Sequence, residues 1–367
     1  KVAFIHPDLG IGGAERLVVD AALGLQNKGH KVAVYTSYRD YNHCFEEARD
    51  GTLDVRVRGD TVVPANLGGR FSILCAMLRQ IHLALTLIMD EDEFDVIFID
   101  QLSAAIPLLQ YNLKAKVVFY CHFPDKLLSS RQSLLKRVYR MPFDLIEGAT
   151  TGAADTILVN SKYTASIFAQ SFPRIDKKPQ VLYPCVSSDH EAETKALDTT
   201  GLKFILSLNR FERKKDVGLA IKAFAKLKGR KSSPSAVLVI AGGHDARVAE
   251  NVATLSELQK LCGTHSLLHK TLHPPYSLPL ALSQPKEGVD VIFMLSIPKP
   301  LKSALLAEAS LLAYTPANEH FGIVPLEAML ASTLVLAQNS GGPLETVQDG
   351  VTGYLRPADA DAWSEVM

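Results

Sequence analysis

The chain has 367 residues and balances 39 lysines and arginines against 39 aspartates and glutamates. This length favours two domains, each with its own hydrophobic core, and the even charge gives no global positive field of the kind that attracts nucleic acid. The five cysteines are widely spaced without a C-x-x-C pair. Their spacing suits a reducing compartment and argues against a disulfide framework or a cysteine zinc site.

The elements along the chain predict an α/β protein. Apolar runs of strand length alternate with longer helical patterns, which is typical of parallel sheets with helices on both faces. The expected strands are Val2–His6, Val32–Thr36, Val96–Ile99, Val117–Tyr120 and Ile157–Asn160 in the first half, and Phe204–Leu208, Val237–Ala241, Val291–Leu295, Ala309–Tyr314 and Leu334–Ala337 in the second.

A polar stretch with almost no apolar pattern separates the two halves. We therefore expect an N-terminal domain over residues 1–186, a linker over 187–201 and a C-terminal domain over 202–367. The predicted fold class is α/β with two doubly wound, Rossmann-like domains that face a cleft. Ligands of such domains bind at the carboxyl ends of the strands.

The first predicted strand leads into a glycine-rich turn that opens a helix. Gly12 and Gly13 in this turn would let the backbone approach a ligand closely, and a helix N-terminus favours anions. The turn completes neither the G-x-G-x-x-G dinucleotide fingerprint nor the Gly-Lys-Ser/Thr of a P-loop. A ligand-binding loop and an ordinary tight turn both fit this pattern.

Two segments of the first half suggest a lipid. Residues Phe71–Met89 are almost wholly apolar, but a bilayer core would penalise the central Arg79 by about 2.5–3.5 kcal/mol, so we expect a buried or interfacial helix. The segment Lys126–Phe143 has no acid and interleaves leucines with basic residues, which would attract anionic headgroups or a pyrophosphate-linked lipid. An ordinary amphipathic surface helix fits it equally. Its basic residues are Lys126, Arg131, Lys136, Arg137 and Arg140.

His122 directly follows a predicted buried strand. The carboxyl end of a parallel strand is a suitable place for a cleft contact, although a structural histidine fits the position as well. The remaining histidines show no metal-ligand spacing such as H-x-x-x-H.

The second half opens with a basic turn after its first strand. Arg210 and Lys215 lie five positions apart there, ahead of a helix expected near Val217, and such a pair can clamp a diphosphate. A solvated basic turn is the alternative. Gly242 and Gly243, after the next strand, form either a loop close to a nucleotide or a plain turn.

The most informative stretch runs from Asn318 to Glu327. It joins a predicted strand to a helix that carries Pro325 in its first turn, and unpaired helical N–H groups at such a junction bind anions. Glu319 in the loop and Glu327 in the helix can accept hydrogen bonds from hydroxyl groups. A ligand with a phosphate for the anion site and a hydroxyl-bearing group for each glutamate would be a nucleotide sugar. The alternative is a capped helix with two solvated glutamates.

Taken together, Gly12-Gly13-Ala14-Glu15, Arg210, Lys215 and the Glu319–Glu327 motif resemble the family 4 retaining glycosyltransferases of GT-B fold. The segments Phe4–Leu17, Tyr120–Asp125 and Asn209–Lys215 further resemble the branch that adds alpha-1,3 and alpha-1,6 mannoses to dolichol-linked oligosaccharides. The resemblance implies GDP-mannose as the donor and mannosyl-chitobiose-pyrophosphoryl-dolichol as the acceptor, in early N-glycan precursor assembly.

The resemblance also implies a role for each residue of the motifs. Arg210 and Lys215 would bind the donor diphosphate, Glu319 the transferred hexose and Glu327 the ribose hydroxyls. Gly12 and Gly13 would lie against the phosphates or the acceptor, and His122 near the hexose. Backbone N–H groups that face the diphosphate and the sugar would come from Phe321, Gly322, Ile323 and Val324.

No cofactor and no metal are expected, because the paired cations with a helix N-terminus can stabilise the departing diphosphate. Asp216 and His320 stand where glycine is common in the family, which could alter the base or sugar preference. The C-terminal helices usual in this fold are missing, so we expect the chain to be part of a longer protein.

The expected location is the endoplasmic reticulum membrane, with the active site on the cytosolic face. The expected partners are the dolichol-linked oligosaccharide, the membrane surface and other early dolichol-pathway mannosyltransferases, with no nucleic acid. Two alternatives remain open. One is a soluble family 4 transferase or a GT-B epimerase with a non-lipid substrate; the other is a non-catalytic nucleotide-sugar-binding protein.

Overall fold

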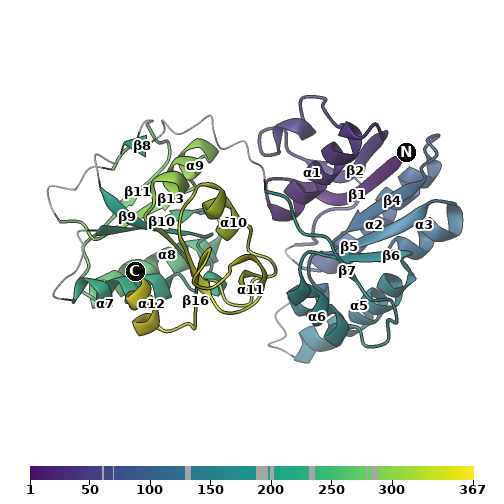
Figure 1. The fold of residues 1–367 in the computed structure, drawn as a ribbon. Coiled ribbons are helices and arrows are strands. Elements are labelled where there is room, and N and C mark those ends of the chain that lie inside the picture. Colours follow the sequence, from purple (N-terminus) through teal and green to yellow (C-terminus); the bar gives the residue numbers. More distant parts are fainter. Residues whose placement is uncertain are drawn as a thin grey trace. The chain divides into compact units, whose positions relative to one another are not determined.

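The computed structural model describes residues 1–59, 62–68, 70–128, 134–186, 197–198, 202–230, 236–277, 280–282 and 288–367. These residues form two compact units, Lys1–Cys185 and Val186–Met367 (Figure 1). Most of the predicted linker, residues 187–201, lies outside the described residues. The exception is the short strand β8 (Leu197–Asp198), which pairs with β12 (Leu280–Ala281).

The first unit is built on a seven-stranded sheet in the order β3-β2-β1-β4-β5-β6-β7, with every neighbouring pair parallel. The strand order reverses between β1 and β4, and in doubly wound sheets ligands bind at such a switch point, at the carboxyl ends of the strands. The strands are β1 (Val2–Leu9), β2 (Val32–Arg39), β3 (Asp54–Val57), β4 (Val96–Asp100), β5 (Lys116–Cys121), β6 (Thr156–Val159) and β7 (Gln180–Val181).

Helices cover both faces of this sheet because successive side chains of a strand point to opposite faces. Ala3 and Ile5 of β1 pack into a core with Leu83 of α2, whereas Phe4 packs into a second core with Val18 of α1. The helices are α1 (Gly13–Asn27), α2 (Ser72–Met89), α3 (Ile106–Asn112), α4 (Asp125–Leu128), α5 (Leu134–Ala153) and α6 (Lys162–Ser171), with a 3-10 turn η1 (Glu46–Ala48).

The second unit repeats this plan with the strand order β11-β13-β10-β9-β14-β15-β16, again parallel throughout. Its switch point lies between β9 and β14. The strands are β9 (Lys203–Leu208), β10 (Ala236–Gly242), β11 (His269–Leu272), β13 (Val291–Leu295), β14 (Leu311–Tyr314), β15 (Val335–Gln338) and β16 (Gly353–Arg356).

Two cores again lie on opposite faces of the second sheet. Leu206 of β9 packs with Leu305 of α9 on one face, and Ile205 packs with Phe224 of α7 on the other. The helices are η4 (Arg213–Lys215, a 3-10 turn), α7 (Gly218–Lys228), α8 (Ala249–Thr264), α9 (Lys299–Glu308), α10 (Ile323–Leu330), α11 (Pro343–Thr346) and α12 (Ala360–Val366).

All ten predicted strands lie in the two sheets, which confirms the α/β class with two doubly wound units. The longer strands that sequence reasoning missed, β3, β11 and β16, stand at sheet edges, and apart from Gly353 their residues are only partly buried or exposed. An edge strand has one neighbour instead of two, so its sequence need not form an apolar run.

The apolar helix α2 packs on its own unit. Among the described residues it alone is long and apolar enough to cross a bilayer, by length and composition. Leu83, Ala84 and Leu87 are nonetheless buried in the core against the sheet, and the Arg79 guanidinium lies 2.8 Å from the Asp8 carboxylate.

Candidate active site

An ion pair joins the loops that follow the two switch-point strands of the second unit. The Lys215 Nζ atom, after β9, lies 2.5 Å from Glu319 Oε2, after β14, and both side chains are largely buried. The Thr315 hydroxyl donates to the Lys215 carbonyl oxygen at 2.6 Å, which ties the two loops further. Burial would raise the pKa of Glu319, but the charge and hydrogen bond of Lys215 outweigh it and the pKa is lowered. Glu319 is therefore an ionised, fixed acceptor.

Tyr314, the last residue of β14, interacts with the Glu319 carboxylate. The side chain is 3% exposed, and its hydroxyl group makes a hydrogen bond to the Glu319 carboxylate. Burial and the charge of Glu319 raise the pKa of the phenol well above its usual value, so it stays a donor. Gly322, with φ of +81°, leaves room for the ring, because a Cβ there would lie 3.4 Å from the Tyr314 hydroxyl oxygen.

Glu327 lies in the second turn of α10 and faces α9. The Lys302 Nζ atom is 2.7 Å from its carboxylate. Each glutamate of the motif thus has its own lysine, Lys215 for Glu319 and Lys302 for Glu327. The charge of Glu327 also helps to raise the pKa of the Tyr314 phenol.

A third loop, after β15, presses against the motif. A Cβ on Gly341 would lie 2.5 Å from the Glu319 carbonyl oxygen, and one on Gly342 would lie 2.2 Å from that of Phe321. The Gly342 N–H donates to the Glu319 carbonyl oxygen at 2.7 Å. These glycines shape the loop that carries Phe321 and leads into the start of α10 at Ile323 and Val324.

Arg210 is less closely engaged than Lys215. Its side chain is 64% exposed and pairs with Glu212 at 3.0 Å, and no ion pair to Glu319 is present in the described part of the unit. Its loop packs on the turn after β10: a Cβ on Gly242, whose φ is +148°, would lie 1.9 Å from the Asn209 carbonyl oxygen. Close packing of these loops is sufficient to require glycine at Gly242.

In the first unit, three side chains meet at the carboxyl ends of β1, β4 and β5. His122 Nε2 lies 2.8 Å from Asp100 Oδ2, and His6 Nδ1 lies 2.8 Å from Asp100 Oδ1. His6 and Asp100 are fully buried, while His122 is one-fifth exposed. Burial alone would raise the pKa of Asp100, but the two imidazoles outweigh it and hold that pKa well below its usual range.

The glycine turn begins α1 as expected, with Gly12 as the N-cap and Gly13 as the first helical residue. The backbone of Gly12 is extended, so its conformation does not require glycine. A Cβ there would instead lie 2.3 Å from Glu15 Oε2. The Glu15 carboxylate therefore lies over the start of the helix. No other atom of the described residues lies within 4 Å of a Cβ position on Gly13.

The prediction that the basic segment faces a membrane is wrong for Arg140. This side chain is 8% exposed, and its guanidinium pairs with Asp125 and Asp144. Lys126 is also engaged within the unit, because its ammonium lies over the Phe172 ring and donates to the Ser171 carbonyl oxygen. Arg137 is exposed, whereas Arg131 and the side chain of Lys136 lie outside the described residues.

Several of these groups were not singled out from the sequence. His6 and Asp100 each directly follow four apolar residues, Val2–Ile5 and Val96–Ile99, a pattern that could have identified them. The Ser340-Gly341-Gly342 sequence directly after an apolar strand was a second such signal. No sequence signal identifies Tyr314 or Lys302, because a tyrosine in a strand and a lysine in a helix are ordinary. Within the described ranges, no group of three or more His, Cys, Asp or Glu could hold a metal ion.

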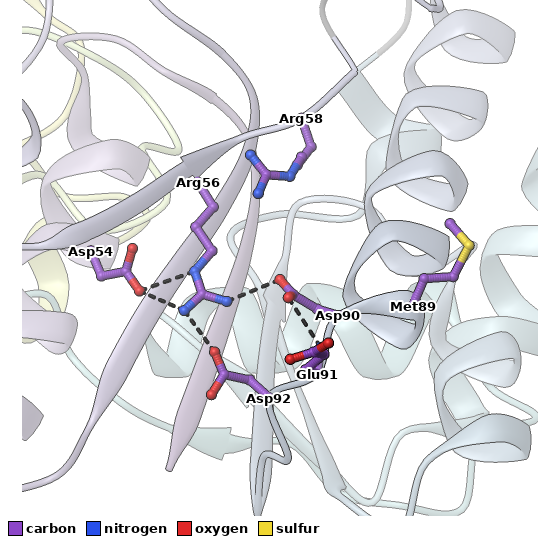
Figure 2. Close-up of a pocket in the computed structure, with 7 residues that line it drawn as sticks. All are labelled: Asp54, Arg56, Arg58, Met89, Asp90, Glu91 and Asp92. Carbon is purple, nitrogen blue, oxygen red and sulfur yellow. Dashed lines mark hydrogen bonds and ion pairs between the residues drawn. The ribbon is translucent and has the colours of Figure 1, made fainter.

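A cavity of the first unit lies along β3 and the loop from α2 into β4, away from the carboxyl ends of β1, β4 and β5 (Figure 2). Arg56 at its centre is bound by Asp54 and Asp92 at 2.8 Å and by Asp90 at 3.0 Å. With three carboxylates around it, this guanidinium has little capacity left for a phosphate. The cavity is lined by Asp54, Arg56, Arg58, Met89, Asp90, Glu91 and Asp92.

Two family models match the chain, one for each half. "Glycosyltransferase Family 4" matches residues 11–190, and "Glycosyl transferases group 1" matches residues 189–367. The chain is 51% identical to the alpha-1,3/1,6-mannosyltransferase ALG2 of Rhizomucor pusillus, over 100% of this chain and 82% of that protein. It is 50% identical to ALG2 of Saccharomyces cerevisiae, over 99% of this chain and 76% of the relative.

Solved structures of glycosyltransferases share the fold. Sucrose-phosphate synthase from Thermosynechococcus elongatus matches with a TM-score of 0.73 and 19% identity, over 100% of this chain and 88% of that chain. WaaG, a glycosyltransferase involved in lipopolysaccharide biosynthesis, matches with a TM-score of 0.68 and 17% identity, over 100% of this chain and 89% of the other. At these identities the likeness is one of fold, and the fold is GT-B.

Proposed function

The chain belongs to glycosyltransferase family 4, among the alpha-1,3/1,6-mannosyltransferases, and on this premise we propose which substrates it uses and which residues act on them. The proposed donor is GDP-mannose, and the proposed acceptor is mannosyl-chitobiose-pyrophosphoryl-dolichol, which receives one alpha-1,3 and one alpha-1,6 mannose. The observation that carries the proposal is the buried pair of Lys215 and Glu319 at the switch point of the second sheet.

Lys215 and Glu319 would lie at opposite ends of the bond that breaks, the bond between the mannose and the diphosphate of the donor. Lys215 supplies a positive charge for the diphosphate, together with Arg210 and the N–H groups at the start of α10. Glu319 accepts hydrogen bonds from the hexose hydroxyls, and Glu327, held by Lys302, accepts those of the ribose. In the free protein Lys215 and Glu319 neutralise each other, so the donor exchanges one internal ion pair for contacts to both of its halves.

Mannosyl transfer requires stabilisation of GDP as the leaving group. As the bond between mannose and GDP breaks, negative charge grows on the diphosphate and positive charge grows on the sugar. Cations fixed at the phosphate end and a carboxylate at the sugar end match this separation of charge. We propose that these groups carry out transfer without a metal ion, and that the acceptor hydroxyl attacks from the face that GDP leaves, with retention, as its proton passes to an oxygen of the departing diphosphate.

The acceptor side of the proposal rests on an exposed apolar stripe of the first unit. Val138, Met141 and Leu145 recur at spacings of three and four on α5 and are each more than half exposed. Leu127 and Leu128 of α4, which packs on α5, are at least half exposed as well. A stripe of this kind beside the exposed Arg137 suits an interface with anionic lipid. The proposed setting is the cytosolic face of the endoplasmic reticulum membrane, among other early mannosyltransferases.

The experiment is a competition between acceptors. Detergent-solubilised protein is given GDP-mannose with equal concentrations of a short-chain lipid-linked mannosyl-chitobiose and of free mannosides. The proposal predicts transfer to the lipid-linked acceptor and none to the free sugars, with UDP-glucose inert as a donor. Transfer to free sugars alone would favour the soluble transferase, and no transfer with intact GDP-mannose binding would favour a binding protein.

A further inference from the structure

An arginine at the carboxyl end of β2 has no acidic partner. Arg39 is the last residue of β2 and lies opposite Leu9, the last residue of β1, in the parallel register. Its side chain is partly buried, and its guanidinium donates to the Ala48 carbonyl oxygen and to the Tyr41 hydroxyl group. Within the described ranges, no aspartate or glutamate forms an ion pair with Arg39.

The hydrogen-bonding capacity of Arg39 is largely unused. A guanidinium has five N–H groups, and the bonds to Ala48 and Tyr41 use one on each terminal nitrogen. The Arg39 Nε atom is buried and has no hydrogen-bond partner in the part of the chain that the structure describes. Such unpaired groups are rare in native proteins and can indicate a bound ion. Arg56 is the opposite case, because three carboxylates surround it.

The neighbouring carboxylates that could neutralise Arg39 are bound to other cations. The Asp8 carboxylate, near the end of β1, lies 2.8 Å from the Arg79 guanidinium. Glu47, directly before Ala48, lies 3.0 Å from the Arg16 guanidinium. The positive charge of Arg39 is therefore available to an anion, and guanidinium groups bind phosphate oxygens with charge-assisted hydrogen bonds.

Tyr41 and its loop hold the guanidinium of Arg39 in place. The guanidinium carbon lies 4.3 Å from the centroid of the Tyr41 ring, which also accepts the hydrogen bond at its hydroxyl. The loop is a turn, in which the His43 N–H donates to the Asp40 carbonyl oxygen at 3.0 Å. Arg49 donates to the Tyr41 carbonyl oxygen at 3.4 Å and adds a second positive charge. A guanidinium stacked on a ring has less freedom to lose when it binds a ligand.

This loop lies beside the glycine turn of the first unit. A Cβ on Gly10 would lie 3.9 Å from the His43 carbonyl oxygen. Arg39 therefore stands at the carboxyl edge of the sheet, where ligands of doubly wound domains bind. The proposed acceptor carries a pyrophosphate, and the basic segment in which we expected its partner has Lys126 and Arg140 engaged within the unit.

We propose that Arg39 binds a phosphate group of the acceptor pyrophosphate, and that Tyr41 is a positioning residue that holds the guanidinium for it. The inference rests on the proposed function, which supplies an acceptor with a diphosphate. The phosphate oxygens would accept hydrogen bonds from N–H groups that have no acceptor in the free protein. Arg39 then contributes to acceptor affinity, so its loss raises the KM for the acceptor and leaves the Kd for GDP unchanged.

The first test compares two soluble ligands, mannosyl-chitobiose diphosphate and neutral mannosyl-chitobiose, by titration calorimetry. GDP is present at saturation, so the donor site is filled and cannot take up the diphosphate. Wild-type protein should bind the diphosphate about 10- to 100-fold more tightly than the neutral sugar, the range for a hydrogen bond to a charged group. Arg39→Ala should lose this preference, and Arg39→Lys, which keeps the charge without the planar fork, should show an intermediate one.

The control for this test is Arg174→Ala, which removes an exposed arginine after the end of α6 and should keep the full preference. Thermal unfolding temperatures show whether each variant is folded. The proposal is overturned by a preference that survives in folded Arg39→Ala or Arg39→Lys at the wild-type level, or by an equal weakening of both ligands.

The second test separates the acceptor diphosphate from a lipid headgroup. Wild-type and Arg39→Ala protein should float equally with phosphatidylserine vesicles, whereas the KM for a short-chain lipid-linked acceptor should rise about 10- to 100-fold in the variant. Loss of vesicle binding with an unchanged KM would assign Arg39 to the lipid surface and overturn the proposal. Absence of mannosyl transfer in the wild type would contradict the proposed function instead, and the calorimetry would still decide the role of Arg39.

Discussion

Lys215 and Glu319 are 104 residues apart in the sequence, yet their side chains form one ion pair of 2.5 Å at the switch point of the second sheet. The fold brings them together because β9 and β14 are neighbours, so the loops that follow these strands meet at one edge. Removal of either residue would leave the other as an unpaired charge in a mostly buried position, which is energetically costly.

Replacement of Lys215 by alanine should weaken donor binding. The diphosphate loses a charge-assisted hydrogen bond, so the Kd for GDP should rise by about 10- to 100-fold. The activity profile should also move to higher pH, because burial then raises the pKa of Glu319 without a counter-charge. Titration calorimetry with GDP checks the first effect. Lys226→Ala is the matched control, since Lys226 is 45% exposed and pairs with Asp361 of α12; equal losses in both variants would contradict the role of Lys215.

Replacement of Tyr314 by phenylalanine should lower kcat while the protein remains folded. The substitution removes only the hydroxyl that holds Glu319, a loss of about 1 kcal/mol or a factor of five to ten in rate. Steady-state kinetics with GDP-mannose measures it. Tyr276→Phe is the control, because its hydroxyl donates to the Leu295 carbonyl oxygen at 2.6 Å away from both glutamates. Full activity in Tyr314→Phe would show that Glu319 needs no support.

Gly342→Ala should abolish activity, since the added Cβ would lie 2.2 Å from the Phe321 carbonyl oxygen and push the donor loop aside. We expect a stability loss of about 1–3 kcal/mol, as for other overpacked positions. Gly24→Ala in the middle of α1 is the opposite case, because no atom of the described residues lies within 4 Å of its Cβ position. That substitution should add roughly 0.5–1 kcal/mol to the free energy of unfolding. Urea titrations compare the two, and similar effects would refute the packing argument.

The carboxyl group of Glu147 should make stability depend on pH near neutrality. It accepts hydrogen bonds from the backbone N–H groups of Asp125 and Lys126 at 2.7 Å and 3.1 Å, but burial and the charge of Asp125 raise its pKa to about 7. The folded state then binds a proton that the unfolded state, with a pKa of about 4.3, has released. This contribution is complete below that unfolded value and is lost as the pH rises through 7.

Glu147→Gln removes this titration. Between pH 5 and 8 the free energy of unfolding of the wild type should fall relative to that of the variant, by roughly 3 kcal/mol at most. Chemical denaturation at a series of pH values measures the difference. Parallel pH profiles of the two proteins would show that Glu147 is ionised throughout.

The exposed stripe on α5 should contribute to vesicle binding. Changing Val138, Met141 and Leu145 together to serine removes three side chains that are each more than half exposed, so binding to anionic vesicles should drop at least about tenfold with little change in stability. Flotation with phosphatidylserine vesicles gives the readout. Leu344→Ser/Val351→Ser changes two exposed side chains of the second unit as a control, and equal losses would assign the binding to hydrophobicity in general.

The sequence was sufficient for those parts of the fold that are buried on both sides. Central strands such as Val291–Leu295 are apolar at every position, and their predicted bounds agree with the structure. The edge strand β3, Asp54–Val57, has alternating charges and one neighbour, so no apolar run reveals it. The Glu319–Glu327 motif was visible because its residues are close in sequence.

The missed and mistaken residues depend on distances that sequence does not contain. Tyr314, Lys302 and the His6–Asp100 pair act through contacts between separate strands and helices. The prediction that Arg140 faces a membrane was wrong because its acidic partners, Asp125 and Asp144, lie just outside the two ends of the segment Lys126–Phe143. The charges within Lys126–Phe143 therefore do not include the two carboxylates that pair with Arg140.

We propose that one protein transfers mannose from GDP-mannose to a lipid-linked acceptor in two linkages, through a site that includes Lys215 and Glu319. The most direct measurement is the structure of the product, determined by NMR after incubation with GDP-mannose and a short-chain mannosyl-chitobiose pyrophosphate lipid. We expect two added mannoses, one alpha-1,3 and one alpha-1,6, and none with Glu319→Gln. A beta linkage, a sugar other than mannose, or an unchanged product from the Glu319→Gln protein would contradict it.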